Sequence, residues 1–212
     1  MQLQLWMRKE EVPAGSHICH LYPRSKGDEV TQVATALLIS GAEARYRCMY
    51  LGPPSTVEEI VTALHKSDMP VEQMRQSGQL VITDQRDPYL LNGRFEPYHL
   101  LSTHMTAIRQ AQIDGWRGAA IGIDMHWLTD GVGNNALTLK YEALCDAVFT
   151  FQQQPIVAIA QYSLDKLGAD MAVEMNKLHP LSIQARHLRR NPNYVNSEQY
   201  LKNFMRSPRQ VR

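Results

Sequence analysis

The stretch "SHICH" near the N-terminus has side chains that could bind a metal or carry redox chemistry. His17 and Cys19 are two residues apart, so on a strand both face one side while His20 faces the other. With two more distant histidines, His126 and His179, they could bind zinc or another borderline metal. No compact spacing such as HExxH supports this reading. The alternatives are a hydrogen-bonded core His17 with a buried, apolar Cys19, or a redox-sensing thiol. We favour the core reading and predict no resident metal or cofactor.

A second candidate lies in "AAIGIDMHW", where an apolar run ends at Asp124 and is followed closely by Trp127. A carboxylate at the end of an apolar strand is costly unless it is paired or solvated. We interpret Asp124 as a ligand-orienting acceptor; the alternative is a cap on the next turn or an ion-pair partner. Trp127 could wall an apolar pocket or anchor the core. In a nucleotide hydrolase, such an acid would hold magnesium and would require a phosphate loop.

The segment that should carry the phosphate loop reads "LYPRSKGDEVTQ" and lacks G-x-x-x-x-G-K-[ST]. Lys26 precedes Gly27 instead of following it. The acids Asp28 and Glu29 suit a helix N-terminus but would repel a polyphosphate. The sequence also has no G-x-S-x-G elbow. We therefore expect neither ATP hydrolysis nor another catalytic activity.

Five further polar residues are candidates for a binding site. Tyr22 ends one predicted strand, and Gln161 and Tyr162 end another. Glu142 lies near the edge of the apolar stripe of a helix, where it could be a pocket acceptor or ordinary helix surface. His179 precedes a proline, which favours a helix terminator over a pocket residue.

These residues are distributed over alternating strand and helix patterns. The predicted strands cover 16–22, 46–52, 78–84, 118–127, 155–163 and 181–188. The predicted helices cover 27–44, 55–67, 97–115, 135–154, 164–180 and 196–204, and Ser55 with Glu58 predicts a capping box. Crossover connections of this length favour a three-layer α/β domain with a central, mostly parallel sheet. Ligands of such sheets bind beyond the carboxyl ends of the strands.

Composition limits the functional classes. The chain has 212 residues, 44% of them hydrophobic, and a formal net charge of +1, so no strong field attracts it to nucleic acid or a membrane. It lacks a long apolar run and a signal-peptide pattern, and its three cysteines are widely spaced. We expect a cytoplasmic protein with reduced thiols, no direct nucleic-acid contact and no membrane association.

Eight motifs occur in the order typical of MEDS domains, which the chain resembles over residues 12–196. They are "GSHICHLY", "YRCMYLG", "GQLVITD", "GIDMHW", "YEALCDAVF", "AIAQYS", "LHPLSI" and "NPNYV". Residues 1–11 are then an N-terminal extension, and residues 197–212 a short helix and basic tail. The resemblance implies a RecA/KaiC-like fold that has lost its phosphate loop. It also implies a prokaryotic small-molecule sensor for simple hydrocarbon derivatives, found beside DNA-binding domains and histidine kinases.

The sequence departs from the family pattern at Ala160, Ser163, Asp124 and His20, which prevents transfer of the ligand's identity. We find no helix-turn-helix or kinase module, so we expect signalling through a separate kinase or DNA-binding regulator. Homo-oligomerisation is plausible.

We predict a non-catalytic sensor that binds a small, mostly apolar ligand at the ends of the first, fourth and fifth strands. Asp124 and Gln161 would be polar anchors, and Trp127 and Tyr162 walls. One alternative is a pseudo-ATPase that binds a nucleotide through Arg24 and Lys26 without turnover. The other is a structural or interaction protein whose own side chains fill the pocket.

Overall fold

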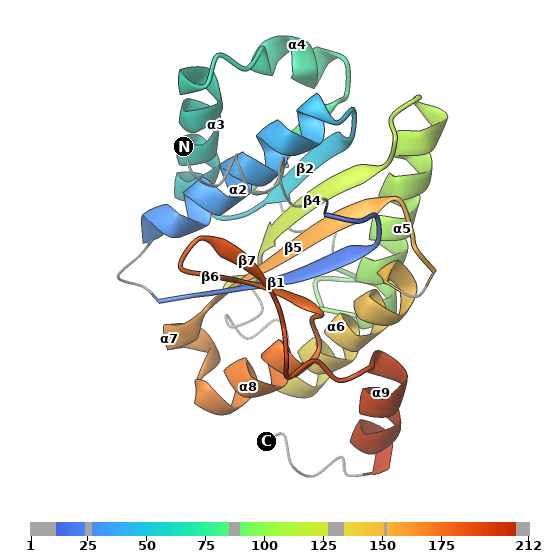
Figure 1. Cartoon of the computed structure of the whole chain (residues 1–212). Coiled ribbons are helices and arrows are strands. Elements are labelled where there is room, and N and C mark those ends of the chain that lie inside the picture. The colour runs from blue at the N-terminus through green and yellow to red at the C-terminus, as the bar shows by residue number, and fades with distance from the viewer. Residues whose placement is uncertain (1–11, 24–26, 85–89, 127–133, 151, 207–212) are drawn as a thin grey trace.

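A central seven-stranded sheet organises the structure, which is a computed structural model that describes residues 12–23, 27–84, 90–126, 134–150 and 152–206 (Figure 1). The strand order is β3-β2-β4-β5-β1-β6-β7, and every neighbouring pair is parallel except β6 and β7. The strands are β1 (Ser16–Tyr22), β2 (Arg47–Leu51), β3 (Leu80–Thr83), β4 (Ala119–Asp124), β5 (Ile156–Ser163), β6 (Leu181–Gln184) and β7 (His187–Arg190). The predicted mostly parallel α/β sheet is confirmed.

Helices cover both faces of this sheet (Figure 1). One face packs against α2 (Gly27–Glu43), α3 (Pro54–Lys66) and α4 (Val71–Gln76). The other packs against α5 (Pro97–Ile113), α6 (Asn135–Phe149), α8 (Ala169–Lys177) and α9 (Ser197–Arg206), and the short α7 (Leu164–Leu167) follows β5. Side chains alternate along each strand, so Ile18 joins the core beneath α2 and Cys19 the core beneath α6. We call these the α2 face and the α6 face.

Three local predictions were wrong. Ser55 does not cap α3, which begins at Pro54 with Pro53 as its N-cap and no side-chain cap hydrogen bond. The helix predicted at 164–180 is divided at Gly168, whose φ of 79° is incompatible with a continuous helix, and it ends at Lys177. The strand predicted at 181–188 is the hairpin of β6 and β7. Its turn residues adopt positive φ without glycine, which removed the usual hairpin signal.

The centre of the sheet is packed closely around Gly122 on β4. A Cβ atom there would lie 2.8 Å from Cδ2 of Tyr50 on β2. The missing side chain therefore gives the Tyr50 ring the room to lie across β4, with its hydroxyl 3.0 Å from Gln161 on β5. Among the described residues, no helix has the length and apolarity needed to cross a membrane.

Candidate functional site

The predicted site residues form two groups on opposite faces of the sheet, so the prediction of one shared crevice was wrong. Gln161 and Tyr162 are neighbours on β5, and their side chains point to opposite faces because strand residues alternate. Tyr22, Asp124 and Gln161 lie on the α2 face. The α6 face carries the other described candidates, which are His17, Cys19, Glu142, Tyr162 and His179. Trp127 lies outside the described residues.

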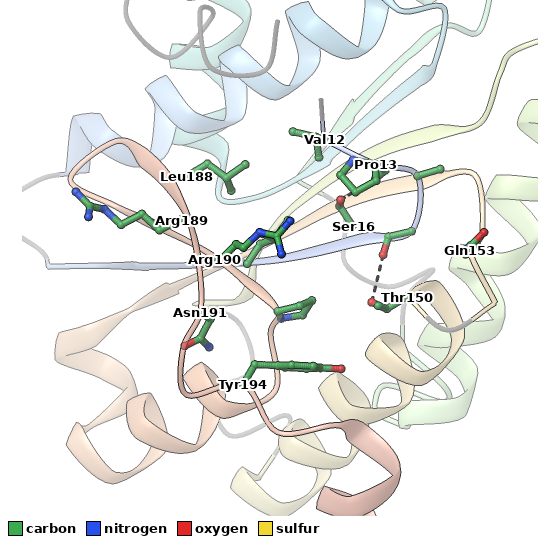
Figure 2. A pocket seen from close by; sticks show the side chains of 14 residues that line it. Val12, Pro13, Ser16, Thr150, Gln153, Leu188, Arg189, Arg190, Asn191 and Tyr194 are labelled. Carbon is green, nitrogen blue, oxygen red and sulfur yellow. Dashed lines mark hydrogen bonds between the residues drawn. The ribbon is translucent and has the colours of Figure 1, made fainter. Parts of the chain in front are cut away.

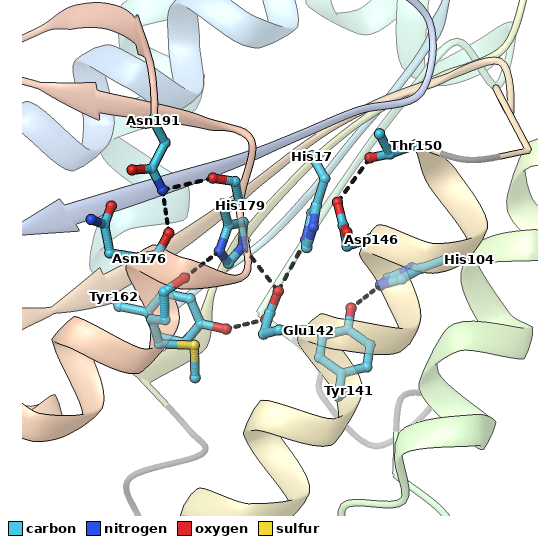
Figure 3. A network of polar contacts seen from close by, with 11 residues as sticks. His17, His104, Tyr141, Glu142, Asp146, Thr150, Tyr162, Asn176, His179 and Asn191 are labelled. Atoms are coloured by element: carbon cyan, nitrogen blue, oxygen red, sulfur yellow. Dashed lines mark hydrogen bonds and ion pairs between the residues drawn. The ribbon is translucent and has the colours of Figure 1, made fainter. Parts of the chain in front are cut away.

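Three residues of the α6 face form a buried group that we call the His–Glu–His cluster: His17, Glu142 and His179 (Figure 3). The Oε2 atom of Glu142 lies 3.0 Å from Nε2 of His17 and 3.1 Å from Nε2 of His179. The other carboxylate oxygen, Oε1, accepts a hydrogen bond from the Tyr162 hydroxyl. Glu142 and His179 are fully buried and His17 is 2% exposed. A charged group therefore lies inside an otherwise apolar core, where it must be compensated.

Four separate elements bring the cluster together. His17 comes from β1, which lies between β5 and β6 in the sheet, and Tyr162 comes from β5. Glu142 lies on α6, eight of whose 15 residues are buried. His179 follows α8, and its backbone carbonyl accepts a 2.8 Å hydrogen bond from the side-chain amide of Asn191. The same amide donates to the carbonyl of Asn176 near the end of α8. Asn191 was not a predicted site residue, and it positions the segment that carries His179.

The hydrogen bond of His179 to the backbone fixes the tautomer of its ring. Nδ1 lies 2.8 Å from the carbonyl oxygen of Met175, and because a carbonyl can only accept, Nδ1 carries a hydrogen. In a neutral ring, Nε2 then carries a lone pair that points at a carboxylate oxygen. Nε2 of His179 and Oε2 of Glu142 face each other at 3.1 Å, and the described part of the chain supplies neither atom with a hydrogen-bond partner from outside the cluster. These two atoms require a proton or a cation between them.

The cluster strongly perturbs the acidity of its members. Burial alone raises the pKa of Glu142, but hydrogen bonds and charge from His17 and His179 outweigh it and hold that pKa well below its usual range. Burial, reinforced by His179, lowers the pKa of His17, and Glu142 only partly offsets this. Burial and the charge of Glu142 raise the pKa of the Tyr162 phenol. At neutral pH the cluster therefore contains an ionised carboxylate and a tyrosine that remains a donor.

A small cavity of about 20 Å³ adjoins His17 and Glu142. It is lined mainly by apolar side chains of β4, β5 and α6, including Ile121, Ala158 and Phe149. This volume is sufficient for about one water molecule. A space for a water-sized group therefore lies beside two members of the cluster, His17 and Glu142.

Two further polar groups, neither predicted from the sequence, lie beside the cluster on the α6 face (Figure 3). Nε2 of His104 on α5 lies 2.8 Å from the hydroxyl of Tyr141 on α6, and burial lowers the pKa of His104 to about 4. The carboxylate of Asp146, one turn after Glu142, accepts hydrogen bonds from Thr150 at 3.0 Å and Tyr194 at 2.8 Å. Asp146 has only a weak signal in the sequence, which is its spacing of four residues from Glu142 along the buried stripe of α6.

Tyr194 connects this buried acid to a surface pocket of about 710 Å³ (Figure 2). The pocket lies where β1 and β6 begin and includes Arg189, Arg190 and Thr150 in its lining. Both arginines are exposed. The pocket is thus at the opposite end of β1 from Tyr22 and is separate from the cavity of the cluster.

On the α2 face, Asp124 is almost fully buried and bound within the protein. Its carboxylate accepts from the Tyr22 hydroxyl at 3.3 and 3.4 Å and from the backbone N–H of His126 at 3.0 Å. The second contact is the turn-capping alternative considered from the sequence. His126 lies beside Asp124 and not in the His–Glu–His cluster, which excludes it from the metal set considered for His17 and His179.

Gln161 is the centre of a second buried network on the α2 face. Its oxygen accepts from Tyr50 at 3.0 Å, and its amide lies 3.0 Å from Nδ1 of His20 and 3.1 Å from the carbonyl of Val30. Nε2 of His20 lies 3.5 Å from Glu29. Burial lowers the pKa of His20 to about 4, although Glu29 acts in the opposite direction. The side chain of Gln161 is therefore fully used within the protein.

Cys19 lies on the same face as His17 but does not belong to the group of close ligand atoms. Burial and the charge of Glu142 raise its thiol pKa well above the ordinary value. Because the thiolate is the reactive form, this environment makes Cys19 a poor redox sensor.

In a comparison with known protein families, one family model matches the chain. The family model described as the methanogen/methylotroph, DcmR sensory domain, MEDS, matches residues 16–180. This range contains His17, Glu142, Tyr162 and His179. No curated protein matches the chain.

Proposed function

Because the chain belongs to the MEDS family of sensory domains, we propose that it is a non-catalytic small-molecule sensor whose ligand site is the His–Glu–His cluster with Tyr162. The supporting observation is the cluster itself: an ionised carboxylate, two imidazoles and a phenol, all buried beside a cavity. Buried polar groups of this kind cost stability unless they are fully paired, and here Oε2 of Glu142 and Nε2 of His179 have no partner among the described residues outside the cluster. Such a site is suited to a ligand that supplies the missing partner.

The cavity limits the ligand that fits without rearrangement. A space of about 20 Å³ accepts one water-sized polar group, while the apolar lining suits a short hydrocarbon portion. A larger molecule must displace α5 or α6, whose side chains line the cavity. Ligand binding would therefore select a conformation that differs at these elements, which gives a sensor its output.

We also infer that the domain is a RecA/KaiC-like fold without phosphate binding. The first turn of α2 contains Asp28 and Glu29, and Glu29 lies beside buried His20. A negative side chain at this helix N-terminus opposes a polyphosphate. The proposal includes a cytoplasmic location and a separate kinase or DNA-binding regulator as the recipient of the signal.

The test is a binding screen that follows the histidine ring signals of the full chain by NMR. The panel contains one- to four-carbon alcohols, aldehydes, amines and halides, with ATP as a comparison ligand. We expect at least one small organic compound to shift the His17 and His179 signals saturably, and ATP to leave them unchanged. Tyr162→Phe should weaken this binding, whereas Tyr50→Phe, which removes a buried hydroxyl on the α2 face, should not.

The absence of saturable binding across the panel, with and without added divalent cations, would contradict the sensor proposal. It would favour an interaction protein whose core is filled by its own side chains.

A further inference from the structure

We propose that the His–Glu–His cluster binds one divalent transition-metal cation of the zinc or iron(II) class, through Nε2 of His17, Oε2 of Glu142 and Nε2 of His179. The three atoms all lie within 4.8 Å of one another and are buried. The inference rests on the proposed function for the cation's role in sensing, but binding of the cation is tested separately.

The donor atoms suit this class of metal. Two imidazole nitrogens and one carboxylate oxygen form a set that binds zinc or iron(II) and leaves coordination positions open. Ligands at roughly 2.0–2.2 Å from a shared cation lie roughly 3.0–3.4 Å apart. The two distances from Glu142 Oε2, 3.0 Å to His17 and 3.1 Å to His179, fall in this range. The imidazole rings of His17 and His179 have centroids 4.1 Å apart and planes inclined by 36°, so both rings lie on the same side of the cluster as neighbours.

Two of the three donor groups, His179 and Glu142, are oriented from behind as metal ligands usually are, whereas Nδ1 of His17 has no hydrogen-bond partner among the described residues. Metal-binding histidines commonly donate their other ring N–H to a backbone carbonyl, as His179 does to Met175 at 2.8 Å. This bond leaves the Nε2 lone pair directed into the cluster. Metal-binding carboxylates are in turn hydrogen-bonded, as Oε1 of Glu142 is by Tyr162. The second carboxylate oxygen, Oε2, is then left for the cation, and the polar groups that it contacts among the described residues are the two imidazole nitrogens of the cluster.

The charges around the cluster favour a cation. Glu142 supplies one buried negative charge, and the carboxyl group of Asp146, one helical turn away and fully buried, acts on His17 in the same direction. Across the described residues, no lysine or arginine forms an ion pair with either acid. A dipositive ion would compensate this arrangement more completely than one proton.

The cavity provides the remaining coordination position. It borders His17 and Glu142 and has room for about one water-sized group. A water molecule, or the polar end of a small organic ligand, could occupy this position on the cation. The cation would thereby give an apolar pocket a specific attachment point for an oxygen, nitrogen or sulfur atom.

A proton shared between Glu142 and His179 is the competing explanation for the same distances. It predicts a folded chain that binds no metal. The two explanations are separated by treating the purified full chain with a chelator, then titrating it with Co²⁺ and Zn²⁺ while recording visible absorption and thermal stability. We expect one equivalent of Co²⁺ to give ligand-field bands, Zn²⁺ to displace it, and either ion to raise the melting temperature.

Glu142→Gln and His17→Gln should each weaken Co²⁺ binding at least about 100-fold, since each removes a ligand. His20→Gln is the matched control, because it replaces a buried histidine of the same strand on the opposite face, and it should bind Co²⁺ like the wild type. If the ligand variants do not fold, X-ray absorption of the Zn²⁺-loaded wild type gives the answer independently. Two imidazoles in the zinc shell support the site, and a shell without imidazole overturns it.

A folded wild-type chain without saturable Co²⁺ binding overturns the inference, as does unchanged binding in folded Glu142→Gln. If Co²⁺ binds saturably but no organic compound of the panel binds, the cation site is supported and the sensor proposal is contradicted. If an organic compound binds but the chain takes up no Co²⁺, the sensor proposal is supported and the cation site is overturned.

Discussion

The hydrogen bond from Tyr162 to Glu142 provides a direct test of the charge in the core. Tyr162→Phe keeps the ring, which is 2% exposed, and removes only the hydroxyl that donates to Oε1 of Glu142. A hydrogen bond to an ionised group contributes about 1.5–3 kcal/mol, and its loss leaves a buried charge less well satisfied. We expect the free energy of unfolding to fall by about 2–3 kcal/mol at pH 7.

Tyr141→Phe is the matched comparison for this measurement. Tyr141 is 4% exposed and lies next to Glu142 in sequence, but its hydroxyl pairs with His104. His104 is neutral at pH 7 because burial lowers its pKa to about 4. Loss of a neutral hydrogen bond costs about 1 kcal/mol.

Urea denaturation, monitored by circular dichroism with chelator present, gives the free energy of unfolding of both variants and of the wild type. The difference of at least about 1 kcal/mol between them follows only if Glu142 is ionised. Equal destabilisation by Tyr162→Phe and Tyr141→Phe would refute the assignment of a buried carboxylate.

Three further predictions concern His20 and Gly122 in the central sheet and Asn191, which holds the His179 segment. The folded-state pKa of His20 is lowered to about 4, so the unfolded chain, with a pKa of about 6.5, binds more protons between these values. His20 therefore makes the free energy of unfolding fall by up to roughly 3 kcal/mol as the pH drops from about 6.5 to 4. In His20→Gln, the midpoint of urea denaturation should depend less on pH in this range than it does in the wild type. Gly122→Ala places a Cβ 2.8 Å from a ring carbon of Tyr50, so we expect a loss of about 1–3 kcal/mol in urea denaturation. Asn191→Ala removes two hydrogen bonds to backbone carbonyls and should cost about 2 kcal/mol and broaden the His179 NMR signal, while exposed Asn193→Ala should change stability by less than about 0.5 kcal/mol.

Each of these has an outcome that would contradict it. An unchanged pH profile in His20→Gln would mean that this histidine titrates alike in the folded and unfolded chain. Wild-type stability of Gly122→Ala would show that Tyr50 can move away from β4 without cost. Equal effects of Asn191→Ala and Asn193→Ala would show that Asn191 does not hold the His179 segment.

The architecture could be predicted from the sequence because its signals are local. Apolar runs such as "AAIGID" and helical spacings such as that of Val30, Val33 and Leu37 depend only on the period of each element. The order of these elements requires crossover connections, which gives a mostly parallel sheet covered on both faces. The opposite orientations of His17 and His20 also followed from the two-residue period of a strand.

The two-residue period of a strand also requires Gln161 and Tyr162 to point to opposite faces of the sheet. The prediction that both line one crevice did not take this into account. The non-glycine turn at Ala185 and Arg186 gave no hairpin signal, because positive φ at such residues is imposed by the fold and not by local preference.

Only the tertiary structure decided which polar residues meet. Glu142 could be surface or pocket from its position on a helix, and His179 could be a simple helix terminator. Their contact with His17 depends on the insertion of β1 between β5 and β6 and on the docking of α6 over β1. These are long-range packing relations, which no spacing along the chain encodes. The composition of the buried cluster, and with it the candidate chemistry, is therefore a property of the fold, whereas the fold class is a property of the sequence pattern.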